Sequence, residues 1–305
     1  MDKKYKDLVI IGSGPAGLAA AVYGKRAMLD EVVLEREMIG GGQIVTTERV
    51  DNYLGLYGIG GYELAEKFKE HADALQVPFL ETGAETITDC GAYKEIKLEN
   101  GDTIEAKAVL LATGATHKKL GAKGEEAFAG AGVSYCATCD GAFFAGKTVA
   151  VAGGGDVALE DALYLSGVCE KIYLVHRRDE FRAAKTLQEK VKNTTNIEFL
   201  PFYEIREIGG TETVEYIVLQ NNQSREERKL EVSGVFIAIG MEPQSEILKG
   251  IAEMDERGYV KATEDCRTSA KGIYVAGDVR TKSLRQIITA VSDGANAVAS
   301  IEQDR

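Results

Sequence analysis

Two cysteines separated by two residues, Cys136 and Cys139, are the side chains of this sequence best suited to carry a reaction, and Asp140 follows them directly. The short spacing lets both sulfurs reach bonding distance without moving the backbone, so the pair can alternate between dithiol and disulfide. Glycine-rich motifs lie on both sides of the pair in the sequence. This arrangement indicates a device that passes reducing equivalents from a nucleotide to a disulfide.

The first glycine-rich motif has the order strand, glycine turn, helix. An apolar run over residues 8–11 precedes Gly12–Gly17, which reads GSGPAG, and an alanine-rich stretch over residues 18–27 follows. This context is typical of a dinucleotide site, because glycines permit a tight turn and a helix N-terminus presents free N–H groups to a pyrophosphate. The next predicted strand, residues 31–34, ends at Glu35, whose carboxylate is placed to accept hydrogen bonds from an adenosine ribose.

The second glycine-rich motif repeats this order. A buried-strand pattern over residues 148–152 precedes Gly153–Ala158, which reads GGGDVA and fits G-x-G-x-x-A. A helical stretch over residues 159–166 and a predicted strand over residues 171–175 follow. The chain therefore contains two candidate dinucleotide sites in the same register.

The residue after the second strand differs in charge between the two motifs. Glu35 lies 23 positions after Gly12, and His176 lies 23 positions after Gly153. Three arginines follow the histidine: Arg177, Arg178 and Arg182. A carboxylate repels the 2′-phosphate of NADP(H), whereas guanidinium groups bind it through charge-assisted hydrogen bonds. The first site thus suits FAD or NAD and the second suits NADP(H), with a solvated basic face as the alternative for the arginines.

Length and strand pattern predict two domains. A chain of 305 residues exceeds what one hydrophobic core usually serves. Apolar runs end at glycine near residues 108–114 and 234–240, and a further run over residues 272–278 comes late in the chain. Such a late strand predicts that the C-terminal segment rejoins the first domain. We expect an α/β protein with one domain of residues 1–117 plus 246–305 and an inserted domain of residues 118–245.

Composition narrows the partners and the compartment. The net charge of −12 argues against nucleic acid or an anionic membrane as a partner. No run approaches the ~18 apolar residues of a membrane span, and the four apolar residues after Asp7 are too few for a signal peptide. We therefore expect a cytoplasmic protein, in which a Cys-x-x-Cys pair is catalytic or metal-binding more often than structural. The lone cysteines Cys90, Cys169 and Cys266 are expected to be small buried residues.

Three other interpretations of the cysteine pair remain. A zinc site needs two further ligands, but the chain has three histidines and no second Cys-x-x-Cys. A structural disulfide does not suit a reducing cytoplasm. A flavin-binding interaction module without turnover would leave the cysteines and the second nucleotide motif unused.

Taken together, these motifs make the chain resemble the low-molecular-weight thioredoxin reductases, flavoproteins with two dinucleotide-binding domains. The resemblance covers nearly the whole length. It rests on Gly12–Gly17, the loop Gly41-Gly42-Gln43, Asn52, the segments CATCDG and HRRDEFRA, Gly277-Asp278 and the stretch 285–290. CATCD between two nucleotide motifs is specific, whereas either glycine motif alone is not.

The resemblance implies a homodimeric enzyme that moves electrons from NADPH through FAD to thioredoxin, with FAD in the split domain and NADPH in the inserted one. Cys139 would be the sulfur that faces the flavin, Cys136 the sulfur that attacks the protein substrate, and Asp140 the proton donor and acceptor. A turn or helix-capping role is the alternative for Asp140, because Asp-Gly is a common turn pair. The family also implies rotation of the inserted domain about linkers near residues 116–119 and 242–245.

The resemblance and the motifs together predict the cofactor contacts. FAD would be contacted by Gly12, Ser13, Gly14, Pro15, Ala16, Gly17, Glu35, Gly42, Gln43, Asn52, Thr113, Gly114, Gly277, Asp278, Arg285, Gln286 and Ile287. NADPH would be contacted by Gly153, Gly154, Gly155, Asp156, His176, Arg177, Arg178, Arg182, Ile239 and Gly240. No metal ligand is implied. Lone amides such as Gln43 and Asn52 more often bond backbone in loops, and the segment from Arg285 could form an exposed helix start.

Two departures from the family pattern remove no group that the chemistry needs. Val157 stands where a small polar residue is usual, and Leu54 stands where a proline often follows the Asn-Tyr pair. The β-branched Val157 changes packing at a helix start and would alter NADPH affinity slightly. The alternative functions are a ferredoxin-driven flavin thioredoxin reductase and a reductase of another CxxC protein.

Overall fold

The structure is a computed structural model that describes residues 4–37, 40–47 and 49–305. Residues 1–3, with which the expected domain 1–117 begins, lie outside the described residues. The chain divides into two compact units, Met1–Thr116 with Glu242–Arg305, and His117–Met241. The two chain crossings, β7 (Ala115–His117) and β16 (Met241–Pro243), pair as a two-stranded sheet. The second boundary therefore lies four residues before 246, because the chain forms a strand where the sequence pattern ended at Gly240.

The first unit is built on a parallel sheet. Its strands β3 (Phe79–Glu81), β2 (Glu31–Glu35), β1 (Lys4–Ile11) and β6 (Thr103–Leu111) pair in that order. These strands read as apolar runs because both faces of a parallel sheet are covered. The side chains of Leu8, Val9 and Ile10 are fully buried.

The opposite edge of β6 has two different partners. An antiparallel hairpin, β4 (Ala84–Asp89) and β5 (Lys94–Leu98), joins the start of β6, and β17 (Ile273–Val275) pairs in parallel with Val109–Leu111 at its end. The late strand thus returns to the first unit, which confirms that expectation from the sequence. The sequence analysis did not predict the β4–β5 hairpin.

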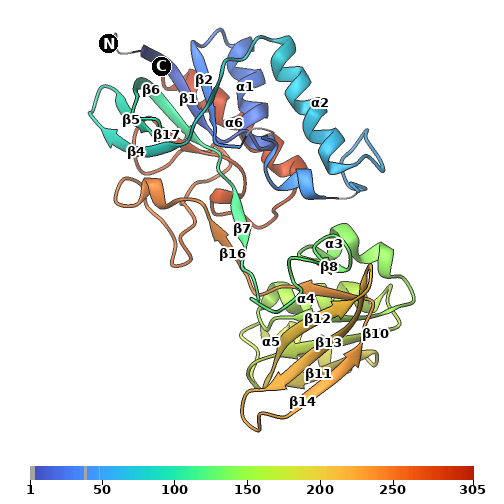
Figure 1. Cartoon of the computed structure of the whole chain (residues 1–305). Coiled ribbons are helices and arrows are strands. Elements are labelled where there is room, and N and C mark those ends of the chain that lie inside the picture. Colours follow the sequence, from blue (N-terminus) through green and yellow to red (C-terminus); the bar gives the residue numbers. More distant parts are fainter. Residues whose placement is uncertain (1–3, 38–39, 48) are drawn as a thin grey trace. The chain divides into compact units, whose positions relative to one another are not determined.

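Helices α1 (Pro15–Arg26), α2 (Gly61–Ala74) and α6 (Ile287–Gln303) belong to the same unit (Figure 1). α1 and α6 approach closely, since a Cβ on Gly294 would lie 2.2 Å from the carbonyl oxygen of Ala16. One apolar cluster joins these two helices to the sheet residues Leu8, Ile10 and Leu110. The short helices η1 (Gly42–Thr46), η3 (Glu246–Leu248) and η4 (Gly277–Val279) lie in the connecting segments.

The second unit has its own parallel sheet, in the order β11 (Ile197–Pro201), β10 (Lys171–His176), β9 (Thr148–Ala152), β15 (Gly234–Ile237) and β8 (Val133–Ser134). Helices α3 (Ala137–Asp140), α4 (Asp156–Ser166) and α5 (Lys185–Asn193) and the short helix η2 (Gly141–Phe144) connect these strands. The buried side chains of α4, such as Leu159 and Leu165, pack in one cluster with sheet residues such as Val151.

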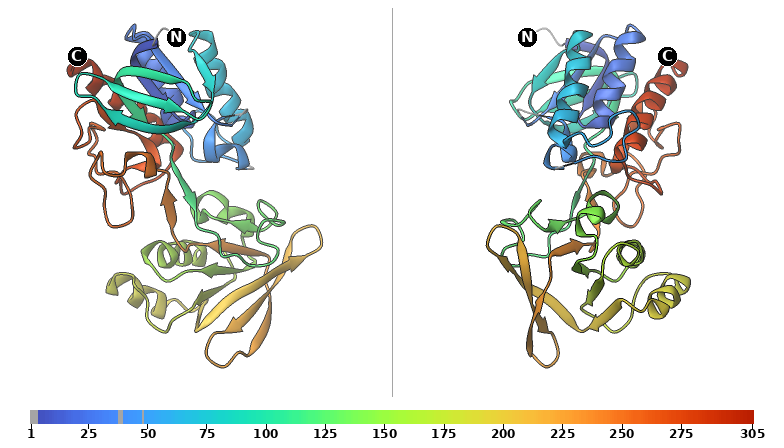
Figure 2. Two further views of the ribbon diagram at one scale, coloured as in Figure 1. Left: turned by 60° about the vertical axis from the view of Figure 1, so that its left-hand side comes forward. Right: turned by 90° about the vertical axis from the view of Figure 1, so that its right-hand side faces the viewer.

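A third sheet completes the second unit. Strands β12 (Tyr203–Gly210), β13 (Val214–Asn221) and β14 (Glu227–Glu231) form an antiparallel ribbon, drawn in yellow and orange in Figure 2. Their inward side chains, including Ile217 and Leu219, share a core with Val235 of β15. The turn between β13 and β14 therefore belongs to the same unit as the second glycine motif.

The two glycine turns have matching geometry. Gly12 and Gly153 adopt φ values of +102° and +155°, and a Cβ would lie 2.7 Å from the carbonyl oxygen of Ala112 and 2.4 Å from that of Ala238, respectively. Only glycine fits such a close approach of backbone to backbone. The strand registers Ile11↔Leu34 and Ala152↔Val175 place Glu35 and His176 at the same position of each unit, as the equal offsets predicted.

Candidate functional site

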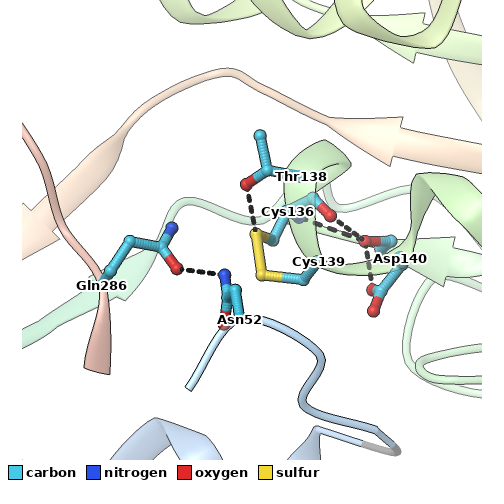
Figure 3. Close-up of a disulfide and its surroundings, with 7 residues drawn as sticks. Asn52, Cys136, Thr138, Cys139, Asp140 and Gln286 are labelled. Atoms are coloured by element: carbon cyan, nitrogen blue, oxygen red, sulfur yellow. Dashed lines mark hydrogen bonds between the residues drawn. A yellow bond between two sulfur atoms is a disulfide. The ribbon is translucent and has the colours of Figure 1, made fainter. Parts of the chain in front are cut away.

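Cys136 and Cys139 form a disulfide at the start of α3, with their Cα atoms 5.3 Å apart (Figure 3). Cys136 caps the helix in extended conformation, and the amide N–H groups of Cys139 and Asp140 donate to its carbonyl oxygen. The Thr138 hydroxyl lies 3.5 Å from Cys136 Sγ. The single helical turn therefore holds both sulfurs and the following carboxyl group in one short segment.

Ser134 fixes Asp140 beside the disulfide. The Ser134 hydroxyl donates to Asp140 Oδ2 at 2.6 Å and accepts the backbone N–H of Cys136 at 3.1 Å. Ser134 is itself buried at the end of β8. Asp140 is thus held by a side chain from another element. A role in the local Asp-Gly turn alone does not explain this contact. The sequence analysis did not identify Ser134, because a lone serine carries no motif.

The segment before the disulfide is anchored by a buried carboxylate. Glu125 accepts the hydroxyl of Tyr135 at 2.8 Å and the backbone N–H groups of Leu120 and Gly121 at 3.0 and 2.8 Å. The Tyr135 ring stacks on His117, with centroids 4.9 Å apart. Burial lowers the pKa of His117, so its imidazole is neutral at pH 7. These contacts order the strand that leads into Cys136.

The basic segment after β10 folds back over the second glycine turn. The backbone N–H of Arg182 donates to the Gly154 carbonyl at 2.8 Å, and that of Ala184 donates to Asp156 Oδ1 at 2.7 Å. One carboxylate oxygen of Asp156, a predicted cofactor contact, therefore already accepts a hydrogen bond from the protein backbone. The backbone of Arg182 therefore lies at the glycine turn of its own unit.

His176 lies under this segment. Its side chain is 7% exposed, its ring packs against Gly154, and it stacks on Phe181 with centroids 5.9 Å apart. Burial, with smaller contributions from the neighbouring arginines, lowers the pKa of His176. Its Nε2 atom is buried without a hydrogen-bond partner. A neutral imidazole with one unpaired nitrogen suits a position at the floor of a ligand site.

A cavity of about 360 Å³ opens beside the arginines. It is lined by Arg177, Arg178, Asp179, Glu180, Phe181, Arg182, Phe202, Asn222 and Gln223. Among the described residues, the guanidinium groups of the three arginines have no ion-pair partner, and all three are exposed. The arrangement can bind a phosphate monoester with several charge-assisted hydrogen bonds. Sequence reasoning missed the distant lining residues Phe202, Asn222 and Gln223, of which Asn222 lies 45 positions beyond Arg177 in the chain.

In the first unit, Glu35 is engaged with the glycine turn. Its Oε2 atom accepts the backbone N–H and the hydroxyl of Ser13 at 2.8 and 2.6 Å, and its Oε1 atom accepts the N–H of Glu37 at 2.9 Å. A carboxylate offers about four lone-pair sites, so acceptor capacity remains for a ribose hydroxyl. The structure therefore brings together two residues that the sequence analysis predicted for one ligand.

The predicted amide contacts lie in three different environments. Gln43 Nε2 donates to the carbonyl of Ala115. Asn52 Nδ2 donates to Gln286 Oε1 at 2.9 Å, as Figure 3 draws, across 234 positions of sequence. Gln286 is also the N-cap of α6, where it completes a capping box with Thr289. The amides thus have protein partners, and Gln286 combines a helix start with the pairing to Asn52.

Asp278 and Arg285 carry polar atoms that the protein leaves unpaired. Asp278 Oδ1 and Arg285 Nε are buried and have no hydrogen-bond partner. Burial raises the pKa of Asp278, against the lowering effect of Lys282 and Arg285. The Arg285 guanidinium covers the Tyr259 ring at 4.1 Å. A buried acceptor and a buried donor without partners fit a polar ligand such as the ribityl and phosphate groups of FAD.

A buried charge cluster fixes the Gly277-Asp278 turn. Asp293 accepts two hydrogen bonds from Arg280 at 2.6 and 2.8 Å, one from Lys282 at 2.8 Å and one from the Gly277 N–H at 2.9 Å. Although burial alone would raise it, these hydrogen bonds keep the pKa of Asp293 below its usual value. Sequence reasoning missed this cluster, because its members are spread over a loop and the following helix without a motif.

The remaining predicted residues lie on the motifs that carried them. Pro15 and Ala16 begin α1, Gly42 begins η1, Ile287 begins α6, and Ile239 and Gly240 follow β15. The Thr113 hydroxyl donates to the Gln244 carbonyl at 2.6 Å, next to Gly114. The described residues contain no cluster of histidine, cysteine and carboxylate side chains that could hold a metal ion.

One prediction about the lone cysteines is wrong. Cys169 and Cys266 are buried as expected, but Cys90 is exposed. Cys90 lies in the turn between β4 and β5, and the sequence analysis had not recognised that hairpin. Of the helices that the structure describes, none combines the length and apolarity needed to cross a bilayer.

Comparison with known proteins relates the whole chain to one group. A family model described as pyridine nucleotide-disulphide oxidoreductase matches residues 6–294. A thioredoxin reductase of Bacillus subtilis (strain 168) is 41% identical over 304 residues, covering 99% of this chain and 95% of that protein. The crystal structure of thioredoxin reductase from Streptococcus pyogenes MGAS5005 is 39% identical, covers 99% of both chains and superposes with a TM-score of 0.93. Lactococcus lactis thioredoxin reductase in its FR conformation is also 39% identical, covers 98% of both chains and gives a TM-score of 0.68.

Proposed function

Because this chain belongs to the pyridine nucleotide-disulphide oxidoreductase family and is an NADPH- and FAD-dependent thioredoxin reductase, we propose that Cys136, Cys139 and Asp140 carry its chemistry. The membership confirms the family resemblance and the fold class predicted from the sequence. The observation that carries the assignment is the disulfide between Cys136 and Cys139, with a carboxyl group held in the same turn.

The two units would hold the two cofactors. We assign FAD to the first unit, residues 1–116 plus 242–305, where Glu35 accepts hydrogen bonds from Ser13 of the glycine turn and the unpaired atoms of Asp278 and Arg285 fit its polar groups. We assign NADPH to the second unit, residues 117–241, where Arg177, Arg178 and Arg182 would bind the 2′-phosphate. FAD, when bound, takes a hydride from NADPH and supplies two electrons to the disulfide.

The protein's own groups complete the reduction. Cys139 is the sulfur that receives the electron pair, the S–S bond breaks, and Cys136 leaves as a thiolate. Asp140 donates one proton to the departing Cys136 sulfur and the Cys139 sulfur takes the second from solvent, so that two electrons and two protons convert the disulfide to a dithiol. Cys136 then attacks the disulfide of thioredoxin to form a mixed disulfide, and Cys139 attacks that bond, releasing reduced thioredoxin and restoring the oxidised pair.

Replacing Asp140 with asparagine is expected to lower kcat for thioredoxin reduction by about 10²-fold, the lower end of what a positioned proton donor contributes. Asparagine keeps the size of the side chain and its contact with Ser134, but it has no proton to give. Steady-state assays with oxidised thioredoxin check this result. Ser134→Ala removes one hydrogen bond to the carboxyl group and one from the Cys136 N–H but keeps the proton donor, so its loss of kcat is expected to be smaller. Wild-type turnover by the Asp140→Asn enzyme would leave the carboxyl group with a structural role alone.

Cofactor choice is tested by stopped-flow absorbance with NADPH and NADH in parallel. We expect rapid bleaching of the flavin band with NADPH, much slower bleaching with NADH, and thiol formation after both. Arg177→Ala combined with Arg178→Ala is expected to lower kcat/KM for NADPH by about 10²-fold, because two charge-assisted hydrogen bonds are lost. Arg206→Ala is the matched control, since this arginine of the same unit pairs with Glu204 instead.

The same experiment separates the alternative functions. Indifference to both nucleotides combined with reduction by ferredoxin would favour the ferredoxin-driven enzyme. Bleaching by NADPH without reduction of thioredoxin would favour a different CxxC protein as the acceptor.

We further propose a cytoplasmic homodimer in which the inserted unit rotates about the two crossings. Rotation of this kind lets one flavin meet the nicotinamide and the disulfide in turn. Multi-angle light scattering of the FAD-loaded protein tests this proposal. We expect the mass of a dimer, and the mass of a monomer would refute it.

A further inference from the structure

The turn between β13 and β14 is held in one conformation by its own hydrogen bonds. Asn221 Oδ1 accepts the backbone N–H groups of Gln223 and Ser224, each at 2.9 Å. The Asn221 carbonyl accepts the N–H of Arg225 at 3.0 Å, and Arg225 adopts the left-handed conformation with φ of 63°. Such side-chain-to-backbone bonding makes an ordered turn. The turn is therefore a fixed platform for the residues that it presents.

Asn222 connects this turn to two other residues that line the cavity, Phe202 and Arg177. Its backbone N–H donates to the carbonyl of Phe202 at 2.8 Å, and Phe202 has a left-handed φ of 64°. A bulky residue in that region is uncommon and persists only when surrounding contacts determine it. The Asn222 side chain donates from Nδ2 to the carbonyl of Arg177 at 2.7 Å.

Besides the bond from Gln188 Nε2 to the Ala183 carbonyl at 2.8 Å, the bond from Asn222 is a further anchor of the arginine segment. Its far end is tied to the glycine turn through Arg182 and Ala184, and its near end follows directly from β10. Without the Asn222 side chain, the carbonyl of Arg177 would lose this hydrogen bond at the start of the arginine segment. Within the part of the chain that the structure describes, the guanidinium groups of Arg177 and Arg178 have no partner to position them. Their placement therefore depends on where the backbone is held.

We propose that Asn222 is a positioning residue for NADPH: by holding the backbone at Arg177 it places the arginines for the 2′-phosphate and contributes to discrimination against NADH. This inference rests on the proposed binding of the 2′-phosphate by those arginines. It adds a determinant of cofactor choice from the antiparallel ribbon, outside the nucleotide motif itself. A residue with this role affects the phosphorylated dinucleotide and leaves the rest of the cofactor's binding energy unchanged.

The test uses the FAD-loaded enzyme with Asn222→Ala. We expect KM for NADPH to rise about fivefold, the loss of one hydrogen bond, with kcat unchanged and KM for NADH unchanged. Isothermal titration should show weaker binding of 2′,5′-ADP by a similar factor and unchanged binding of 5′-ADP. Adding Asn222→Ala to the Arg177→Ala, Arg178→Ala double variant is expected to cause no further loss of NADPH affinity, because Asn222 acts through the arginines of that segment.

Two further variants keep the test decisive. Asn222→Ser retains a turn-favouring residue, but its shorter side chain does not reach the Arg177 carbonyl, so the same NADPH-specific loss is expected even if the alanine variant fails to fold. Asn196→Ala is the matched control, because Asn196 makes the same kind of amide bond, to the carbonyls of Ser166 and Cys169 at 3.0 and 3.2 Å. It should leave the ratio of NADPH to NADH constants unaltered.

The outcomes separate this inference from the proposed function. Equal loss with NADPH and NADH, or no loss with either, would overturn the positioning role while the arginine site stands. A wild-type enzyme that binds 2′,5′-ADP no better than 5′-ADP would overturn both.

Discussion

Replacing Cys139 with serine is expected to lower turnover with thioredoxin by more than about 10³-fold, while NADPH still bleaches the flavin. In the proposed mechanism Cys139 is the sulfur at which the electron pair enters, and a serine hydroxyl cannot form a disulfide. Cys136 remains in this variant as a free thiol. It should attack oxidised thioredoxin once and remain joined to it, because the second sulfur that would resolve the mixed disulfide is absent. Mass spectrometry of the product checks the covalent complex.

The companion variants assign the two sulfurs. Cys136→Ser should be equally inactive, but it should form much less of the covalent complex, since Cys139 faces the flavin in the proposed mechanism. Cys90→Ser, which removes an exposed cysteine of the other unit, should retain wild-type turnover. Thioredoxin reduction at the native rate by the Cys139→Ser enzyme would refute the proposed route.

The second large effect concerns Glu31, a carboxyl group that the reaction does not use. Glu31 is 0% exposed, both of its oxygens lack hydrogen-bond partners, and it lies against Gly24 of α1. Burial raises the pKa of Glu31 from 4.5 to about 8. Below pH 4.5 the folded and unfolded chains both hold the proton, so the group costs no ionisation energy. As the pH rises toward 8 the unfolded chain alone releases it, and stability falls by about 1.4 kcal/mol per pH unit.

Glu31→Gln should remove this loss. We expect the difference in unfolding free energy between variant and wild type to grow by a few kcal/mol between pH 5 and pH 8, in favour of the variant. Urea unfolding followed by release of flavin fluorescence reports on the first unit and checks the result. Glu302→Gln, at an exposed position of α6, is the control and should show no such growth. A pH-independent difference for Glu31→Gln would mean that the carboxyl group is ionised in the folded protein.

The sequence predicted the parts of the fold that follow from strand periodicity and glycine turns. Equal offsets of 23 residues predicted equivalent positions for Glu35 and His176, and the strand registers bear this out. The close approach of Gly12 to the carbonyl of Ala112 is predictable from the sequence, because no residue other than glycine fits there. The late apolar strand predicted the return to the first unit for a similar reason, since buried parallel strands read as continuous apolar runs.

The remaining features depend on tertiary contacts that have no local pattern. Asn222 reaches Arg177 only because the antiparallel ribbon folds beside the parallel sheet, and nothing near Asn222 in sequence indicates that meeting. The same holds for Asp293, whose buried partners come from a separate loop. Glu31 would be expected at the surface on residue type alone, because an unpaired carboxylate is costly to bury. Such groups are found only once the packing around them is known.

The pairing of β17 with β6, together with the packing of α6 on α1, dictates an order of events on the ribosome. The first unit lacks β17 and α6 until residues 273–303 have been synthesised, whereas all of His117–Met241 is synthesised before them. The inserted unit can therefore reach its native state while the unit that surrounds it is still incomplete. In a nascent chain halted before residue 273, we expect the inserted unit to be folded while the two segments of the first unit are not yet joined by the pairing of β17 with β6.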